Sequence, residues 1–357
     1  MVTVKKNFWE NKKVFITGHT GFKGTWLSLM LEQLGCAIKG FSLPIIIKEN
    51  AFFNCIESEL NLNSSFGDIR DYKYLEEEIK NFNPDIVFHL AAQPLVRDSY
   101  DDPVNTLEIN VIGTANLLNI CRNIPSIGCI INVTSDKCYQ NLESGREFKE
   151  NDPMGGNDPY SCSKGCAELV SSSFLKSFYE KLNISLCSVR AGNVIGGGDH
   201  SLDRLVPDIL RSCNDKRKIK LRNPSAIRPW QHVLEPLNGY ICLAERAYED
   251  KSFSGGWNFG PTKNSFRSVE WLTKEMLKKL NADYKNIVIE NDENKPESKV
   301  LKLSIEKAIK KLGWAPVLSL QESLDLIVSW NKAWNQKQNM YNFSTSQISH
   351  YITRKDK

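Results

Sequence analysis

The 357-residue sequence predicts an α/β protein with a doubly wound parallel sheet and a smaller C-terminal α/β domain. Three observations favour this fold class. Apolar, strand-like runs alternate with helical patterns through the first half of the chain, which is typical of a parallel sheet covered on both faces. The first of these runs leads into a glycine-punctuated turn, GHTGFKG, and the alternation breaks into loops after Arg190.

The first half divides into short apolar strands and longer segments with apolar residues at helical spacing. The expected strands are 13–17, 37–42, 85–90, 128–133 and 184–190, and the expected helices are 24–34, 72–81, 105–121 and 160–182. Pro84 marks the end of the second helix. Residues 1–190 are therefore expected to form the doubly wound domain.

The second half reads as a less regular domain. Residues 191–232 and 261–340 are expected to form it, with a helix over 321–334, whereas 233–260 are expected to return to the first domain. Residues 341–357 are polar and are expected to form a loose tail.

Composition excludes several classes of protein. Hydrophobic residues are 41% and charged residues 25%, as in an ordinary soluble protein. The net charge of +4 is small and the basic residues are mixed with acidic ones, so neither nucleic acid nor membrane is an expected partner. The N-terminus is polar and has no apolar signal core, which predicts a cytoplasmic protein.

Ten cysteines raise the question of disulfides or metal. Most lie inside apolar stretches, and no C-x-x-C occurs. Cys162 and Cys166 are four residues apart but have no histidine pair nearby to complete a zinc site. We therefore expect free thiols and no metal.

The glycine-punctuated turn indicates a dinucleotide site. Gly18, Gly21 and Gly24 are spaced G-x-x-G-x-x-G between a strand and a helix. Glycines there permit a tight turn and let the backbone approach a pyrophosphate at the helix N-terminus. The cofactor is expected to contact the whole segment, which also holds His19, Thr20, Phe22 and Lys23.

The end of the second strand bears on the identity of that cofactor. An NAD binder usually has an acidic residue there for the ribose hydroxyls, but this sequence has Ser42. Serine can still bond a ribose, and no arginine is present to hold a 2′-phosphate, so NAD is favoured over NADP. Asp68 and Ile69 suit the adenine side, although Asp68 can equally be a helix cap.

The strand over 85–90 ends in Leu90-Ala91-Ala92-Gln93, where small residues let a cofactor lie across the sheet edge. Asn110 lies in the middle of an expected helix, where a polar residue with a structural hydrogen bond is one reading. Its other reading is a role in holding the active-site lysine and a water chain.

Two residue groups carry the chemistry. Tyr160 and Lys164 lie one helical turn apart on a shared face, so the ammonium is expected to lower the pKa of the phenol and let the phenolate act as a base. Ser135, Asp136 and Lys137 directly follow an expected buried strand. This acid-and-amine pair supplies a second proton donor and acceptor, which oxidation alone does not need.

Taken together, GHTGFKG, Asn110, Ser135, Tyr160 and Lys164 resemble the extended short-chain dehydrogenase/reductase superfamily, which has a Rossmann fold. The resemblance covers nearly the whole chain. The segment TSDKCY is similar to the sugar-nucleotide 4,6-dehydratases, which usually carry Thr-Asp-Glu or Thr-Ser-Glu there. The stretches RAGNVIGGGD, RLVPD, RPWQHVLEPLNGY and WNFGP are similar to the CDP-glucose 4,6-dehydratase branch, in which lysine follows the aspartate.

The resemblance implies an NAD-dependent lyase of deoxysugar and polysaccharide biosynthesis that converts CDP-D-glucose to CDP-4-keto-6-deoxy-D-glucose. Tyr160 would take the proton of the 4-hydroxyl, and Asp136, with a raised pKa, would protonate the departing 6-hydroxyl. Lys137 stands where related enzymes hold glutamate as the carbon-5 base. It is either that base or an electrostatic helper to the enolate.

Substrate contacts and assembly follow as weaker expectations. Arg228, Arg204 and Asn193 are the candidates for the substrate diphosphate and sugar. The two long helices over 105–121 and 160–182 are expected to pack against another copy in a homodimer or homotetramer. Three alternatives stay open: a nucleotide-sugar 4-epimerase, a dehydratase for another nucleotide sugar, and a catalytically silent nucleotide-sensing protein.

Overall fold

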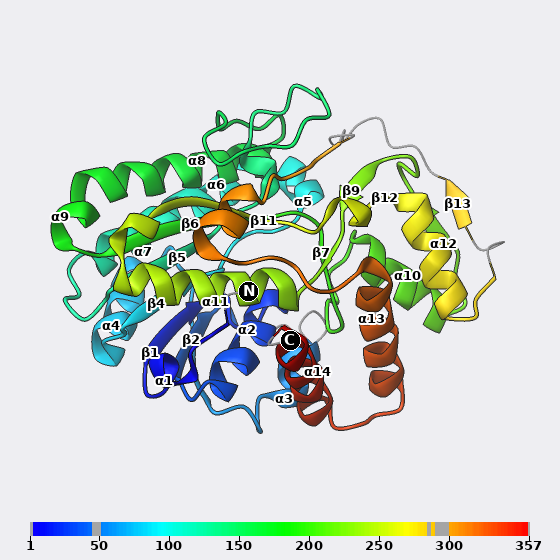
Figure 1. The fold of residues 1–357 in the computed structure, drawn as a ribbon, viewed down its shortest axis with the longest axis horizontal. Coiled ribbons are helices and arrows are strands. Elements are labelled where there is room, and N and C mark those ends of the chain that lie inside the picture. The colour runs from blue at the N-terminus through cyan, green and yellow to red at the C-terminus, as the bar shows by residue number, and fades with distance from the viewer. Residues whose placement is uncertain (1–2, 45–50, 284–286, 290–299, 356–357) are drawn as a thin grey trace.

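The computed structural model describes residues 3–44, 51–283, 287–289 and 300–355. A large lobe is built on a seven-stranded sheet, and a smaller lobe lies on one side of it (Figure 1). The strand order is β11-β6-β5-β4-β1-β2-β3, and every neighbouring pair is parallel. This confirms the predicted fold class.

The strands of this sheet are β1 (Lys13–Thr17), β2 (Ala37–Ser42), β3 (Leu62–Phe66), β4 (Ile86–His89), β5 (Cys129–Val133), β6 (Ser185–Ala191) and β11 (Gly255–Phe259). The helices of the large lobe are α1 (Lys6–Trp9), α2 (Phe22–Gln33), α3 (Ala51–Ile56), α4 (Tyr72–Phe82), α5 (Val96–Asp101), α6 (Pro103–Leu107), α7 (Gly113–Cys121), α8 (Pro159–Phe174), α9 (Glu180–Leu182), α11 (Leu234–Glu249) and α14 (Met340–Lys355).

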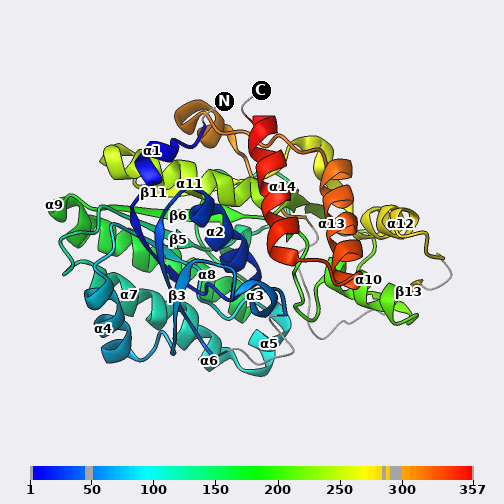
Figure 2. The ribbon, with the colours of Figure 1, turned by 90° about the horizontal axis from the view of Figure 1, so that it is seen from below.

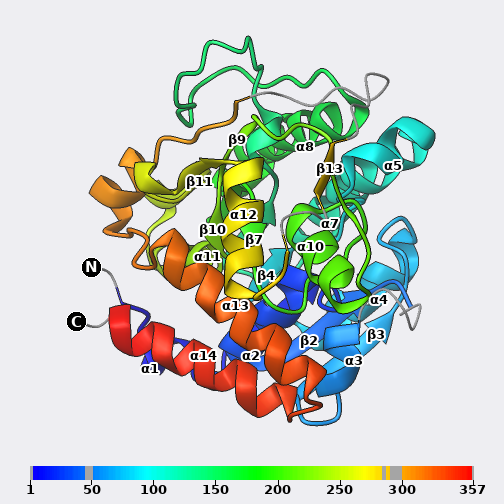
Figure 3. The same ribbon diagram turned by 90° about the vertical axis from the view of Figure 1, so that its right-hand side faces the viewer.

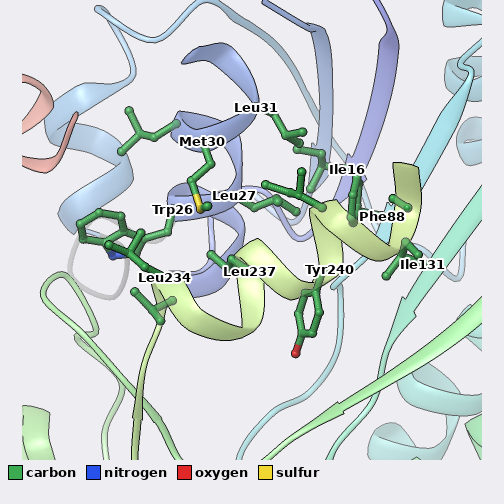
Figure 4. Packing of buried hydrophobic residues seen from close by; sticks show 14 of the residues in the cluster. Ile16, Trp26, Leu27, Met30, Leu31, Phe88, Ile131, Leu234, Leu237 and Tyr240 are labelled. Atoms are coloured by element: carbon green, nitrogen blue, oxygen red, sulfur yellow. The ribbon is translucent and has the colours of Figure 1, made fainter. Parts of the chain in front are cut away.

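Helices cover both faces of the sheet because successive strand residues point to opposite sides. Ile16 of β1 packs into a cluster with α2 and α11, which Figure 4 shows around Trp26, Leu237 and their neighbours. Phe15 points the other way, into a second cluster formed with α4 and α7. Burial on both faces explains why the central strands are apolar throughout.

The edge strand β3 is absent from the predicted elements. Its sequence, LNSSF, is mostly polar, and each of its residues is half-buried or exposed. A strand at the edge of a sheet needs no continuous apolar run, so the periodicity carried no signal there.

The two longest predicted helices each contain a π-helical turn. The segment over 105–121 is formed by α6, the π-turn η1 (Glu108–Ile112) and α7. The segment over 160–182 is formed by α8, the π-turn η3 (Leu175–Tyr179) and α9. Turns of this kind inside α-helices are frequent at functional sites, and η1 holds Asn110.

The chain crosses between the lobes more than once. It leaves the sheet after β6, builds part of the smaller lobe, returns for α11 and β11, and leaves again. The smaller lobe holds α10 (Leu205–Asn214), α12 (Val269–Lys279) and α13 (Leu320–Asn335), with the short strands β7 (Val194–Ile195), β8 (Ile219–Leu221), β9 (Ile227–Pro229), β10 (Gln231–His232), β12 (Phe266–Ser268) and β13 (Ile287–Ile289). Figure 3 shows α10, α12 and α13 gathered around its core.

The expectation of a loose tail over 341–357 is wrong. Helix α14 packs against α2 and α3, and Figure 2 shows it beside α13. The buried hydroxyl of Tyr351 donates to Glu235 Oε2 at 2.8 Å, and Lys355 Nζ donates to the Ala315 carbonyl at 3.2 Å. The segment looked polar because its buried face is partly made of hydroxyl and amide groups, whose partners lie on α11 for Tyr351 and on α13 for Ser344 and Gln347.

No helix in the described ranges is long and apolar enough to span a membrane. The ten cysteines are free thiols. Among the described residues, no three His, Cys, Asp or Glu side chains come together in a way that could hold a metal ion.

Glu235 on α11 binds the C-terminal helix α14 through Tyr351, and this contact leads to a stability prediction. Its buried carboxylate accepts from the Val317 and Leu318 amides at 2.8 and 2.6 Å as well as from Tyr351. Tyr351→Phe removes one donor from a buried carboxylate and is expected to lower the free energy of unfolding by about 1–3 kcal/mol. Urea denaturation measures this loss.

The matched control lies on the same helix. Tyr341 donates to Glu32 Oε2 at 2.8 Å, but this bond is only partly buried. Tyr341→Phe is expected to cost less than about 1 kcal/mol, since water replaces the lost bond. Equal losses in the two variants would contradict the role assigned to burial.

Candidate active site

A cavity of about 910 Å³ lies between the carboxyl edge of the sheet and the smaller lobe. The sheet side contributes Asp136 after β5 and Tyr160 from α8, and the smaller lobe contributes Arg204 and Arg228. Ligands of doubly wound folds bind at this edge of the sheet.

The glycine turn joins β1 to α2, and its backbone is packed too closely to admit side chains at Gly18 and Gly24. Gly18 adopts a φ of +76° and donates its amide to the Phe41 carbonyl at 2.8 Å. A Cβ on Gly24 would lie 2.1 Å from the Gly18 carbonyl oxygen, and one on Gly18 would lie 2.7 Å from the Ala91 nitrogen. The bare backbone therefore forms a cradle at the point where the strand order reverses between β1 and β4, and this cradle fits a dinucleotide.

Ser42 bonds a residue of the glycine turn. Its hydroxyl is buried and bonds His19 Nδ1 at 2.9 Å, while His19 Nε2 bonds Ser64 Oγ at 3.0 Å. The imidazole fills the space above Gly40, where a Cβ would come within 2.3 Å of the ring. The serine therefore anchors the glycine turn, and its contact with a ribose stays a prediction.

Asp68 pairs with Arg70. Its carboxylate accepts from the Arg70 amide and guanidinium at 2.6–3.0 Å, and this bonding lowers the pKa of Asp68. The cap of α4 is Asp71, which accepts from the Tyr74 amide. The helix-cap reading of Asp68 is therefore wrong. Ile69 is buried, and its side chain fills the space above Gly113.

Asn110 connects the segment after β4 to α8. Its side chain accepts from the Gln93 amide at 2.9 Å and donates to the Gln93 carbonyl at 3.1 Å and to Ser163 Oγ at 2.8 Å. Ser163 directly precedes Lys164, so the structural hydrogen bonds expected of Asn110 lie next to the lysine. Its role in holding Lys164 and a water chain stays a prediction.

The segment after β4 is also held by Thr17 at the end of β1. The amides of Leu90 and Ala91 donate to Thr17 Oγ1 at 3.2 Å, and the same hydroxyl bonds His89 Nδ1 at 2.7 Å. The expected cofactor residues Leu90 to Gln93 thus lie against the glycine turn, with Ala92 half-buried between them.

Asp136 is buried with one oxygen unused. Ser135 caps the short helix η2 (Asp136–Cys138), accepts from the Lys137 amide at 3.2 Å and donates to Asp136 Oδ1 at 3.1 Å. Oδ2 has no hydrogen-bond partner among the described residues. Burial raises the pKa of Asp136, although the charges of Lys137 and Arg228 oppose this shift. Burial therefore makes this carboxyl easier to protonate than an exposed aspartate.

The predicted lowering of the Tyr160 pKa is not found. Burial raises the pKa of Tyr160 to about 12, and a hydrogen bond with Ser135 and the charge of Arg204 offset only part of this rise. The prediction weighed the nearby ammonium and not the desolvation of the phenolate. Burial also lowers the pKa of Lys164 to about 8, and its Nζ donates to the Val133 carbonyl at 3.4 Å.

Lys23 has a place that the sequence did not predict. Its motif suggested a cofactor contact, but its side chain lines the same cavity as Asp136 and Tyr160. Burial and the charges of Arg204 and Lys164 lower the pKa of Lys23 to about 8. No local signal marks this orientation, because it depends on how α2 meets the loop after β6.

The predicted substrate residues meet in the cavity. Arg228 on β9 is buried, Asn193 follows β6, and Arg204 Nη1 lies 3.4 Å from Asp199 Oδ2. Arg97 and Arg222, which were not predicted, also line the cavity and lie beside Asp203. Arg97 lies in the short helix α5 and Arg222 in a loop, and a single arginine in either place has no sequence signal that separates it from a surface residue.

The strand order, the glycine cradle and the Tyr160–Lys164 pair define the class of extended short-chain dehydrogenases/reductases. The chain belongs to the family described as GDP-mannose 4,6 dehydratase, whose model matches residues 15–327.

Curated relatives refine this comparison. The chain is 48% identical to a CDP-glucose 4,6-dehydratase of Salmonella typhimurium strain LT2, over 98% of this chain and 99% of the relative. It is 25% identical to a CDP-paratose 2-epimerase of Salmonella typhi, over 90% of this chain and 99% of that protein.

Solved structures share the fold. The dTDP-glucose 4,6-dehydratase DesIV of Streptomyces venezuelae, solved with NAD bound, matches with a TM-score of 0.80 at 22% identity, covering 92% of this chain and 99% of that one. A UDP-glucose 4-epimerase of Thermotoga maritima matches with a TM-score of 0.76 at 20% identity, covering 90% and 99%. Dehydratases and epimerases therefore share this architecture.

Buried histidines predict how stability depends on pH. Burial lowers the pKa of His19 to about 4 and those of His89 and His232 to about 3, from the ordinary 6.5. Below about pH 6.5 the unfolded chain binds protons that the folded chain refuses, so folding stability falls as the pH drops. Each histidine contributes up to about 1.4 kcal/mol per pH unit.

The variant His89→Gln tests this dependence. The variant lacks one histidine that is protonated in the unfolded chain but not in the folded one. Its free energy of unfolding, from urea titrations between pH 7 and pH 4.5, is therefore expected to fall less steeply with decreasing pH than that of the parent. His350→Asn, at an exposed position on α14, serves as the control. An unchanged slope in His89→Gln would contradict the neutral buried imidazole.

Proposed function

We propose that this protein is an NAD-dependent CDP-glucose 4,6-dehydratase that forms CDP-4-keto-6-deoxy-D-glucose and water. The observation that carries the proposal is the buried Asp136 carboxyl, with a free oxygen, in the same cavity wall as Tyr160. Oxidation or epimerisation at carbon 4 has no use for that second acid. The extensive identity to the Salmonella CDP-glucose 4,6-dehydratase supports the choice of substrate.

The glycine cradle between β1 and α2 is where this chain would hold NAD, with Gly18, Gly21 and Gly24 at the pyrophosphate. Phe22 and Thr20 complete the turn, and the segment from Leu90 to Gln93 borders it. NAD bound there would supply a reversible hydride acceptor for the oxidation at carbon 4 and the reduction at carbon 6.

Tyr160 and Ser135 act at the 4-hydroxyl. Tyr160 removes the hydroxyl proton as carbon 4 is oxidised, and Ser135 orients the phenol through their hydrogen bond. The Lys164 ammonium stabilises the phenolate, since a positive charge nearby offsets the burial that raises the Tyr160 pKa. The new ketone acidifies the proton on carbon 5.

Asp136 and Lys137 then act at carbons 6 and 5. Asp136 gives its proton to the departing 6-hydroxyl, which leaves as water, and takes a proton back in the later step. Lys137 lines the cavity next to it and acts at carbon 5. A neutral amine there would remove the proton, and an ammonium would stabilise the enolate.

The diphosphate of the substrate binds Arg228 and Arg204, whose guanidinium groups match phosphate in a fork. Arg228 is buried on β9, so its geometry is set before substrate arrives. Asn193, at the end of β6, bonds the sugar or the diphosphate.

We also propose a cytoplasmic homo-oligomer, either a dimer or a tetramer. Exposed apolar side chains gather on the long helical segments: Val104, Leu107, Ile112, Leu169 and Phe178. Helices of this kind bury their apolar residues against a second copy. Ten free thiols support a reducing compartment. Sedimentation of Leu169→Glu, expected to reduce the oligomer mass, tests the interface.

The function is tested by incubating the full chain with CDP-glucose, UDP-glucose, dTDP-glucose or GDP-mannose, with and without NAD. We expect loss of the 6-hydroxyl with the cytidine compound, seen as a keto-6-deoxy sugar that absorbs ultraviolet light in alkali. A 4-epimer would establish the epimerase instead. Another nucleotide sugar as best substrate would change the specificity, and no turnover would favour the silent nucleotide-sensing protein.

Asp136→Asn is expected to slow water loss by about 10²–10⁴-fold, because the amide cannot donate an acidic proton. The rate of keto-sugar formation from CDP-glucose measures this, and circular dichroism checks that the fold is kept. A rate within a few-fold of the parent would remove Asp136 from the acid role.

Substitutions of Lys137 separate its two roles. A carbon-5 base is expected to be replaced by Lys137→Glu and lost in Lys137→Met, as measured by release of deuterium from carbon-5-labelled substrate. If Lys137→Met retains most of the turnover, Lys137 is not the base. If a third variant, Lys137→Arg, retains turnover and both Lys137→Glu and Lys137→Met lose it, the ammonium acts as an electrostatic helper.

A further inference from the structure

The mechanism above does not use a buried ion pair under the cavity. Glu168 and Arg190 are each about 5% exposed, and Arg190 donates to both carboxylate oxygens, at 2.8 and 2.7 Å. Arg190 also donates to Tyr139 Oη at 2.6 Å and to the Glu150 carbonyl at 2.9 Å. A buried pair of this kind contributes little net stability compared with apolar residues, so a further role is worth seeking.

Glu168 lies one helical turn after Lys164, on the same buried face of α8. It also accepts from Thr134 Oγ1 at 2.5 Å, and Thr134 directly follows β5. Lys164 itself donates to the carbonyl of the preceding residue, Val133, at 3.4 Å. The carboxylate therefore holds together the helix that carries Lys164 and the strand end that Lys164 contacts.

The other groups that act on Lys164 do not favour its charge as Glu168 does. Lys23 is a second cation facing it from α2, and His89 on β4 is kept neutral by burial. Cys138 of η2 is a thiol whose pKa burial holds well above its ordinary value. Tyr160, one turn before Lys164, is neutral until it gives up its proton. Burial alone lowers the pKa of Lys164, and the Glu168 carboxylate is the first influence that opposes it.

We propose that Glu168 is a positioning residue for the Tyr160–Lys164 pair: its carboxylate keeps the Lys164 ammonium charged and holds it at the end of β5. Arg190 has the supporting role of holding that carboxylate in place by its two hydrogen bonds. The inference rests on the proposed function only for the part that Lys164 plays in turnover.

The variants must separate charge from structure. Glu168→Gln keeps the shape and removes the charge, but it leaves Arg190 buried without its partner. The double variant Glu168→Gln/Arg190→Met removes both charges and restores neutrality. Glu168→Asp keeps the charge with a shorter side chain and serves as the conservative rescue.

The direct measurement is the pKa of Lys164 itself. The full chain is labelled with [ε-¹³C]lysine, the signal is assigned with Lys164→Arg, and it is titrated by NMR without nucleotide sugar. We expect the pKa to drop by about one unit in Glu168→Gln, as for loss of one nearby opposite charge, and to stay near the parent value in Glu168→Asp. The drop is expected to be smaller in the double variant, because a like charge is removed together with the opposite one. An unchanged pKa in both charge-removed variants would overturn the proposal.

Turnover gives the second readout. Because the ammonium is lost above its pKa, the alkaline limb of the kcat/KM profile with CDP-glucose is expected to move down by about one pH unit in Glu168→Gln and by less in the double variant. From a parent pKa of about 8, a shift of one unit is about a fivefold loss at pH 8 with little change at pH 6. A loss by the same factor at every pH would indicate a merely structural pair and overturn the proposal. Because the NMR titration needs no substrate, a protein that fails to dehydrate CDP-glucose would still test Glu168.

Discussion

Burial of ionisable side chains at the carboxyl edge of the sheet controls the chemistry available in this cavity. Desolvation always penalises the charged form, so it raises the pKa of Asp136 and Tyr160 and lowers that of Lys164. The acid is thereby easier to protonate than an exposed aspartate. For Tyr160, by contrast, burial disfavours the phenolate that acts as the base, and only hydrogen bonds and nearby positive charge can stabilise it.

Because these groups are desolvated, the polar contacts around them determine how they are positioned and which charged forms are stabilised. Ser135 bonds both Asp136 and Tyr160, so one hydroxyl links the two proton-transfer groups. Asn110 and Thr17 both hold the segment from Leu90 to Gln93, which borders the glycine cradle. The smaller lobe closes the cavity and, with it, maintains the low dielectric that makes these interactions strong.

Much of the fold could be predicted because its signals are local. Apolar central strands, helical periodicity and the glycine spacing each act within a few residues, and the doubly wound sheet follows from their alternation. The polar edge strand β3 and helix α14 were missed or misread because their burial depends on distant partners, such as Glu235 for Tyr351. The helix-cap reading of Asp68 was likewise assigned from position alone, whereas Asp71 is the cap and Asp68 pairs with Arg70.

The sequence by itself determined which reactive groups exist and their local order: the glycine turn, Ser135-Asp136-Lys137, and Tyr160 one turn before Lys164. Only the tertiary structure decided which of them are desolvated, that Lys23 faces Asp136, and that Glu168 meets Arg190 beneath Lys164. The physical reason is that spacing along a helix or turn is set by the backbone nearby. A pKa, in contrast, depends on every charge and on all the protein that surrounds the group, most of it distant in the chain.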